Sequence, residues 1–201
     1  MILIISPSKA QDFSTTPCAA FTQTRQMDFS IELMSILKRK SEAQIATLMS
    51  LSEKLAKLNF DRFQSFQTPF TLANAKQALL AFKGDVYNGI DASSLNEDDL
   101  NFAQGKVRML SGLYGVLRPL DLIQPYRLEM GTKLANNKGK NLYEFWGDDV
   151  SEVLNEDESE LIINLASNEY FKSIDQKSLK ANILNIAFKE KKGDIYKIIG
   201  I

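Results

Sequence analysis

Two short apolar runs, both rich in β-branched residues, lie far apart in the chain. They are Ile2–Ile5 and Leu161–Leu165, and the second is interrupted only by Asn164. Runs of this length without polar alternation are typical of strands that are buried on both faces of a sheet. We therefore predict two buried strands. The polar residues that follow such strands stand where open α/β sheets bind ligands.

Apolar residues recur at spacings of three and four along much of the remaining chain, which is the pattern of amphipathic helices. The Ser-Leu-Asn-Glu sequence that starts at Ser94 fits a capping box and predicts a helix that continues to about Met109. Other helices are predicted over residues 28–40, 41–49, 50–58, 71–82, 148–160 and 169–174.

The last part of the chain has the pattern of a β-hairpin. Ile183–Glu190 and Ile195–Ile201 are predicted strands, and Lys191-Lys192-Gly193-Asp194 between them has the composition of a tight turn. A chain of 201 residues is long enough for one domain with a substantial core. We predict a single domain over residues 1–201 of the α+β class, with a mixed sheet and several amphipathic helices.

Composition narrows the chemistry. The chain is 44% hydrophobic and 24% charged, as in ordinary globular proteins, and it has no histidine and one cysteine, Cys18. Serine–histidine–aspartate triads, cysteine–histidine nucleophiles and disulfide frameworks are therefore excluded, and we expect no metal and no cofactor. The first apolar run is too short for a signal peptide or a membrane span, so we expect a cytoplasmic protein without a membrane partner.

The densest group of glycine, proline, arginine and tyrosine residues is Arg108–Gly131. At its centre, Ser111–Gly115 has two glycines three residues apart, and we call this segment the glycine turn. Because a helix is predicted before it, the turn resembles the middle of a helix-hairpin-helix unit, whose main-chain N–H groups hold a phosphate. Pro119 is tolerated early in a second helix, and Pro125 would end that helix. The alternative is a turn that packs between elements of the core.

Charge allows nucleic-acid binding only through a local patch. The chain has 24 lysine and arginine residues against 25 aspartate and glutamate residues, a formal net charge of −1. Four cations surround the glycine turn in the sequence: Lys106, Arg108, Arg118 and Arg127.

A second group of candidates follows the buried strands and a further glycine-containing segment, Lys83–Tyr87. The candidate catalytic residues are Lys9, Lys83, Asp85 and Glu169, and the candidate residues of a ligand crevice are Ser6, Ser8, Tyr87, Asn164 and Ser167. They predict, as the alternative to a DNA-binding module, an enzyme that acts on nucleotides or damaged bases without a metal. The same residues also fit an ordinary turn at Lys83–Tyr87 and a structural hydrogen bond at Asn164.

Several segments, read together, closely resemble the YaaA family of bacterial peroxide-stress proteins. The resemblance covers essentially the whole chain, and its longest segment is the Arg108–Gly131 block. The other segments are Ser6-Pro7-Ser8-Lys9, Phe82-Lys83-Gly84-Asp85-Val86-Tyr87, Phe145-Trp146-Gly147 and Asn164-Leu165-Ala166-Ser167-Asn168-Glu169-Tyr170.

The resemblance implies survival of hydrogen peroxide and a limit on unincorporated intracellular iron. It also implies binding of double-stranded or branched DNA through a helix-hairpin-helix element in a basic cleft. The residues implied in DNA contact are Lys106, Arg108, Ser111, Gly112, Leu113, Tyr114, Gly115, Arg118 and Arg127. Family members continue past the last strand into a basic segment, which this chain, ending at Ile201, is expected to lack. No feature of the sequence calls for an obligate protein partner.

Overall fold

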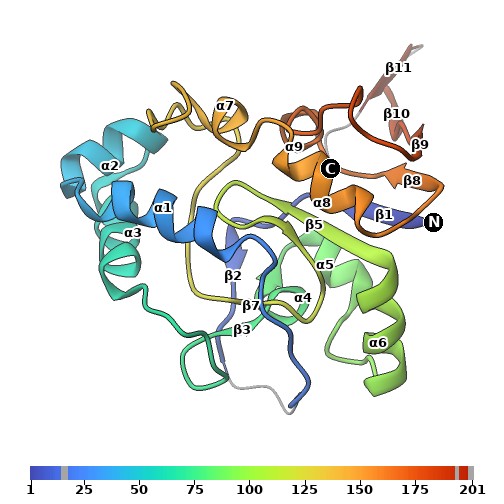
Figure 1. Ribbon diagram of the computed structural model, residues 1–201, viewed down its shortest axis with the longest axis horizontal. Helices are drawn as coiled ribbons and strands as arrows, with labels where there is room; N and C mark the ends of the chain where they lie inside the picture. Colours follow the sequence, from blue (N-terminus) through green and yellow to red (C-terminus); the bar gives the residue numbers. More distant parts are fainter. Residues whose placement is uncertain (15–17, 193–194, 199–201) are drawn as a thin grey trace.

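The centre of the fold is a five-stranded mixed sheet. The computed structural model describes residues 1–14, 18–192 and 195–198 (Figure 1). The strand order is β6-β5-β1-β8-β9, in which β6 is antiparallel to β5 and the other neighbours are parallel. The strands are β1 (Ile2–Ile5), β5 (Val107–Ser111), β6 (Gly115–Leu117), β8 (Leu161–Asn164) and β9 (Asn182–Asn185).

The two strands predicted from the apolar runs are confirmed as neighbours in this sheet. Ile4 of β1 pairs with Arg108 of β5 on one side and with Asn164 of β8 on the other. Since β1, β5, β8 and β9 run in the same direction, their carboxyl ends meet at one edge of the sheet. This edge collects the polar segments that follow β1 and β8 in the sequence.

Helices account for most of the remaining described structure, and an α+β class is confirmed. In Figure 1, α1, α2 and α3 lie together at the left of the molecule, and α6 lies at the lower right and leads into β5. The helices are α1 (Met27–Lys38), α2 (Glu42–Met49), α3 (Glu53–Ser65), α4 (Ala78–Ala81), α5 (Asp85–Ile90), α6 (Glu97–Lys106), α7 (Leu142–Trp146), α8 (Asp149–Asn155) and α9 (Asn168–Phe171).

Local sequence signals explain several helix starts. Ser41 forms a capping box with Gln44 at the start of α2, and Asn96 forms one with Asp99 at the start of α6. The predicted helix from Ser94 therefore exists, but it begins at Glu97 and ends at Lys106. Val107–Ser111 then continues as β5, because these residues pair with β1 on one side and β6 on the other.

The prediction of one helix over residues 71–82 is wrong. This segment forms β3 (Lys76–Gln77), α4 and the start of β4 (Phe82–Lys83). The antiparallel partner of β3 is β7 (Leu122–Ile123), and the antiparallel partner of β4 is β2 (Ala10–Gln11). Tertiary pairing with distant strands has overridden the local helical periodicity.

The predicted helix-hairpin-helix element is also corrected. The glycine turn joins β5 to β6, and Ser111 pairs with Gly115 across an antiparallel ladder. No helix of the described chain follows the turn directly, since β6 is succeeded by β7. The element is a β-hairpin of the central sheet.

A C-terminal hairpin is confirmed, but its predicted bounds are wrong: Ile183–Glu190 is not one strand, and Lys191 and Lys192, predicted in the turn, belong to a strand. Residues 183–190 divide into β9 and β10 (Lys189–Lys192), and β10 pairs antiparallel with β11 (Ile195–Ile198). The predicted turn residues Gly193 and Asp194 and the last three residues lie outside the described part of the chain. Within the described residues, no helix is long and apolar enough to cross a membrane.

Candidate functional site

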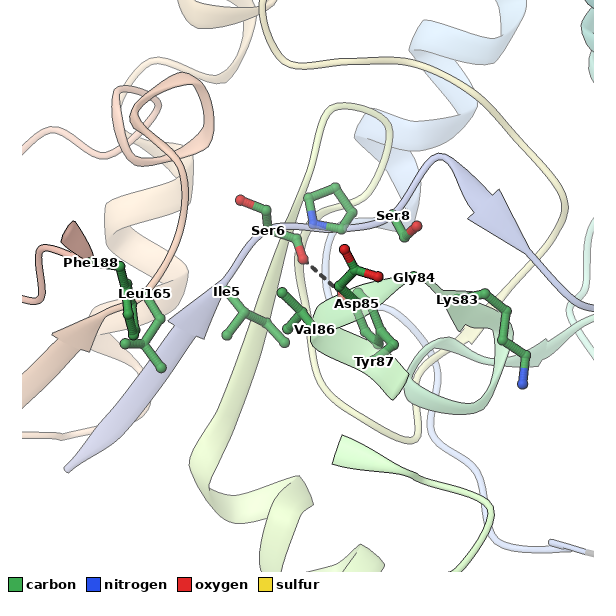
Figure 2. A pocket seen from close by; sticks show the side chains of 11 residues that line it. Ile5, Ser6, Ser8, Lys83, Gly84, Asp85, Val86, Tyr87, Leu165 and Phe188 are labelled. Carbon is green, nitrogen blue, oxygen red and sulfur yellow. Dashed lines mark hydrogen bonds between the residues drawn. The ribbon is translucent and has the colours of Figure 1, made fainter. Parts of the chain in front are cut away.

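A crevice opens at the carboxyl edge of the central sheet, beside the ends of β1 and β8. Its volume is about 240 Å³ (Figure 2). Its polar wall comes from the segment after β1 and from the start of α5, and its apolar wall includes Leu165 and Phe188. The lining residues are Ile5, Ser6, Pro7, Ser8, Lys83, Gly84, Asp85, Val86, Tyr87, Leu165 and Phe188.

Hydrogen bonds between distant segments fix the floor of the crevice. Tyr87 Oη donates to the main-chain oxygen of Ser6 at 2.8 Å, as the dashed line in Figure 2 marks. Ser6 Oγ accepts from the main-chain N–H of Ser167 at 2.9 Å, so the ends of β1 and β8 are tied together. Burial raises the pKa of Tyr87 well above its usual value. Tyr87 is therefore neutral, and its hydroxyl proton is directed to the main-chain oxygen of Ser6.

Gly84 allows the two sides of the polar wall to approach closely. Its φ of +121° belongs to a region that favours glycine, and a Cβ there would lie 3.3 Å from Ser8 Oγ. Asp85 begins α5 directly after this turn. In Figure 2 its carboxylate lies beside the Ser6–Ser8 segment, where a ligand in the crevice can reach it.

Lys83 lines the crevice but does not point at Asp85. Figure 2 shows its side chain extending away from the Asp85 carboxylate. Its Nζ lies 3.8 Å from Asp12 Oδ2, and both side chains are close to half exposed, so this ion pair contributes little to stability.

Lys9 and Glu169 are not among the described residues that line the crevice. Lys9 Nζ pairs with Glu129 Oε2 at 3.0 Å, and Glu169 Oε1 accepts from the main-chain N–H of Gly131 at 2.8 Å. Both lie in segments that follow β1 and β8. Of the four candidate catalytic residues, the crevice brings together Lys83 and Asp85.

Asn164 has a structural role, as one of the two interpretations of the sequence predicts. Its side-chain amide donates to Asn185 Oδ1 at 2.8 Å, and its Oδ1 accepts from the N–H of Ala166 at 3.0 Å. These bonds join β8 to β9 and shape the chain that leads to Leu165 in the crevice wall.

The glycine turn does not present its amides to solvent. All five residues are buried, and the N–H groups of Leu113 and Tyr114 both donate to Ser111 Oγ. Gly112 accepts at its carbonyl from the indole of Trp146 at 3.1 Å. The expectation that Ser111, Gly112, Leu113, Tyr114 and Gly115 hold a phosphate is therefore wrong, because the core of the protein occupies that space.

The cations predicted around the turn are largely committed to carboxylates within the protein. Arg108 is buried and pairs with Asp157 through two hydrogen bonds of 2.7 and 2.8 Å. The other two arginines form the pairs Arg118–Asp121 at 2.8 Å and Arg127–Glu129 at 3.0 Å. Lys106 is half-buried at the end of α6. These pairs explain the high density of arginine in this block without a polyanion.

Six residues of the crevice lining are not among the predicted site residues: Ile5, Pro7, Gly84, Val86, Leu165 and Phe188. Leu165 directly follows β8, at the edge of the sheet where ligands bind, but its apolar side chain does not by itself indicate a binding site. Phe188 falls within the predicted strand Ile183–Glu190, but in the structure it lies between β9 and β10, and 40% of the residue is exposed. An exposed aromatic ring next to a pocket is a signal that only the structure provides.

A metal site has no support in the described part of the chain. No group of three or more cysteine, aspartate or glutamate side chains there is placed to hold a metal ion. The iron limitation implied by the resemblance stays a prediction.

Comparison with known proteins agrees with the resemblance of the sequence. A family model described as peroxide stress protein YaaA matches residues 1–201. The chain is also 52% identical over 203 residues to a UPF0246 protein of Acaryochloris marina (strain MBIC 11017), a match that covers all of this chain and 81% of the relative. The chain therefore belongs to the YaaA family of peroxide stress proteins.

Proposed function

We propose that the protein acts in peroxide defence by binding DNA, and that the crevice, rather than the glycine turn, receives a single base of it. The observation that carries this proposal is the position of the crevice at the carboxyl edge of the sheet, with an exposed aromatic ring on its rim. Ligands of open sheets bind at this edge. Covering DNA in this way would keep iron-driven peroxide chemistry away from the phosphate backbone.

The size and lining of the crevice suit one ring system. Its volume of about 240 Å³ lies below the roughly 300–1,000 Å³ that is usual for pockets of larger ligands. Phe188 and Leu165 offer apolar surface for stacking, which contributes about 1–3 kcal/mol per base. Asp85 and Ser8 offer acceptors for the amino groups of a base edge. A base would have to leave the duplex stack to enter, as it does in proteins that flip bases.

Lysines next to Phe188 would hold the phosphates. Lys189 and Lys191 are exposed and lie on the same face of β10, because alternate residues of a strand share a face. With a formal net charge of −1, the protein as a whole does not attract DNA, so binding requires a local group of cations, for which we propose Lys189 and Lys191.

A salt titration of duplex binding tests the DNA part of the proposal. Affinity should fall steeply between about 50 and 200 mM salt, since several phosphate contacts cost on the order of 10³-fold over that range. The double variant Lys189→Gln/Lys191→Gln should reduce both affinity and salt slope. The matched control, Arg39→Gln/Lys54→Gln, removes two exposed cations near α1 and α3, at the other end of the molecule. A salt-independent affinity, or equal losses in both variants, would exclude the proposal.

The base-binding part is tested by a second pair of variants. Phe188→Ala should weaken binding to a duplex with one mismatched base by roughly tenfold, the loss of one stacked ring. Phe102→Ala removes another exposed phenylalanine, on α6, and should leave binding unchanged. Equal binding by both variants would move the contact away from the crevice.

Catalysis on damaged DNA is a second candidate, in which the crevice receives the sugar of an abasic site in place of a base. It is supported by Lys83 and Asp85 in the crevice. The Lys83 amine would condense with the aldehyde of an abasic site and release water, and Asp85 would accept and return protons. Borohydride would then reduce the imine to a stable adduct that Lys83→Arg cannot form. Repeated failure to trap an adduct with the wild-type protein would remove this candidate and leave the binding function standing.

A further inference from the structure

A second pocket, of about 350 Å³, lies behind Tyr87 and is assigned no role by the proposed function. It shares Lys83 and Tyr87 with the crevice but extends to the loop after α5 and to the segment after β2. Its lining residues are Asp12, Ser14, Cys18, Lys76, Leu79, Leu80, Phe82, Lys83, Tyr87, Asn88, Asp91, Ala92, Ser93, Leu95 and Leu100. We call it the Lys76 pocket.

Lys76 is the unusual member of this lining. It is 6% exposed, and its Nζ donates to the main-chain oxygen of Asp12 at 2.9 Å. Among the described residues, no carboxylate forms an ion pair with it. Burial lowers the pKa of Lys76, which reflects the cost of holding a charge in this place.

The hydrogen bond to Asp12 does not by itself explain a lysine at this position. The neighbouring residue of β3, Gln77, makes equivalent bonds with a neutral side chain, donating to the main-chain oxygens of Cys18 and Ala20 at 3.0 and 2.8 Å. An amide therefore suffices to fasten this segment of chain. A buried ammonium adds a desolvation cost that a hydrogen bond to a main-chain oxygen does not require.

The lining of the pocket holds two lysines and two aspartates, but neither carboxylate lies within ion-pair distance of Lys76. The carboxylate of Asp12 pairs with Lys83, whose Nζ lies 3.8 Å away, while Lys76 reaches only the main-chain oxygen of Asp12. The other carboxylate in the lining, Asp91, accepts from the Ser93 hydroxyl at 2.8 Å. The hydroxyl of Ser14 and the side-chain amide of Asn88 line the same space.

We propose that the Lys76 pocket binds the phosphate group of a small molecule, with the ammonium groups of Lys76 and Lys83 as its cationic ligands. The anion provides the ion-pair partner that Lys76 lacks within the protein and forms charge-assisted hydrogen bonds with both amines. The apolar side of the pocket, which includes Leu79, Leu95 and Leu100, packs against the organic part of the ligand. This site does not depend on a base occupying the crevice.

The test uses inorganic phosphate as the probe, in isothermal titration at constant ionic strength set with chloride. The wild-type protein should bind one phosphate saturably. Lys76→Gln keeps a donor for Asp12 and removes the charge, and it should weaken binding at least roughly tenfold, as the loss of one charge-assisted hydrogen bond predicts. Lys83→Gln should weaken binding less, because Lys83 is more exposed, and Lys76→Arg should retain it.

Asp85→Asn is the matched control, since Asp85 lines only the crevice among these two pockets. It should bind phosphate as the wild type does. Absence of saturable phosphate binding by the wild-type protein, or equal binding by Lys76→Gln, would overturn the proposal. Adenosine, which has no phosphate, probes the crevice alone, so failure of either site is seen independently of the other.

Thermal unfolding provides a second readout that does not rely on binding heat. Phosphate should raise the melting temperature of the wild type more than that of Lys76→Gln, because a ligand stabilises only the state that binds it. General salt effects of phosphate act on both proteins equally. An identical shift in both proteins would contradict the site.

Discussion

The glycine turn and the crevice have similar compositions but opposite environments. Ser111–Gly115 and Lys83–Tyr87 each combine glycine with tyrosine and have charged residues in or beside them. In the turn, every residue is buried and the nearby arginines are paired. In the segment Lys83–Tyr87, Lys83 and Asp85 are exposed and only the tyrosine is buried. Glycine in the first case permits close packing, and in the second it shapes an open wall.

The difference shows that residue type alone does not identify a binding site. Gly115 has a φ of +68°, and a Cβ there would collide with Gln26 and Trp146. Gly84 also has positive φ, but its closest neighbour is one serine hydroxyl at a tight but tolerable contact. The surroundings of a glycine decide whether it serves the core or a ligand.

The largest expected effect concerns the buried Arg108 pair. Asp157→Ala leaves the guanidinium of Arg108 buried without its carboxylate, which should lower the free energy of unfolding by about 3–5 kcal/mol. Urea denaturation measures this loss. Glu156→Ala is the control: its side chain is 61% exposed and 3.4 Å from Arg25, so the expected change is about 0–1 kcal/mol. Similar losses for both variants would show that Arg108 is not a structural cation.

The next effect concerns the turn itself. Gly115→Ala should lower the free energy of unfolding by roughly 2–4 kcal/mol, since positive φ and overpacking against Trp146 both oppose a methyl group. Gly89→Ala on α5 meets no atom within 4 Å and should be neutral or stabilising by up to about 1 kcal/mol. Chemical denaturation of Gly115→Ala and Gly89→Ala measures both changes, and the difference between them separates the packing cost at Gly115 from the general effect of replacing glycine with alanine. A stable Gly115→Ala protein would mean that the turn is loosely packed.

Buried tyrosines connect the two regions, and their ionisation predicts alkaline instability. Burial raises the pKa of Tyr114, Tyr126 and Tyr87 above their unfolded value of about 10. Their contribution to stability is therefore complete below about pH 10 and is lost as the pH rises from there toward the folded pKa. Each such tyrosine should remove roughly 1.4 kcal/mol per pH unit in that range.

Urea denaturation between about pH 8 and pH 11, which brackets the unfolded pKa, measures this slope. Tyr126→Phe should reduce the dependence of the unfolding free energy on pH by the contribution of one tyrosine. At neutral pH it should lower the unfolding free energy by about 1 kcal/mol, because the hydrogen bond to Ser111 is lost. Tyr143→Phe, at a half-buried tyrosine, should change the slope less. An unchanged slope in Tyr126→Phe would show that this hydroxyl ionises freely in the folded protein.

The smallest effect on stability is expected at the crevice. Asp85 is exposed, so Asp85→Asn should change the free energy of unfolding by no more than about 0.5 kcal/mol. The same variant should alter binding of a mismatched duplex, because it replaces one acceptor of the crevice by a donor. Urea denaturation and duplex-binding titration of the same Asp85→Asn protein measure the two effects separately. A large loss of stability would place Asp85 with the core residues.

The sequence by itself determined much of the framework. Continuous apolar runs identified β1 and β8, and a serine identified the start of α2. The capping-box pattern at Ser94 indicated α6, although the cap itself is Asn96 with Asp99. The polar residues after the strands indicated the edge where the crevice lies. These signals are local, so they can be read without knowledge of the fold. The absence of histidine likewise excluded whole classes of catalytic site.

Only the tertiary structure decided which polar segment is buried. Residues 71–82 have a helical pattern, but pairing of β3 with β7 and of β4 with β2 overrode it. Lys76 became a buried pocket residue through that pairing, and Arg108 became a core residue because Asp157, 49 positions away in the chain, faces it. Long-range partners of this kind leave no trace in local periodicity. The burial of a glycine or a cation is a property of its neighbours in space.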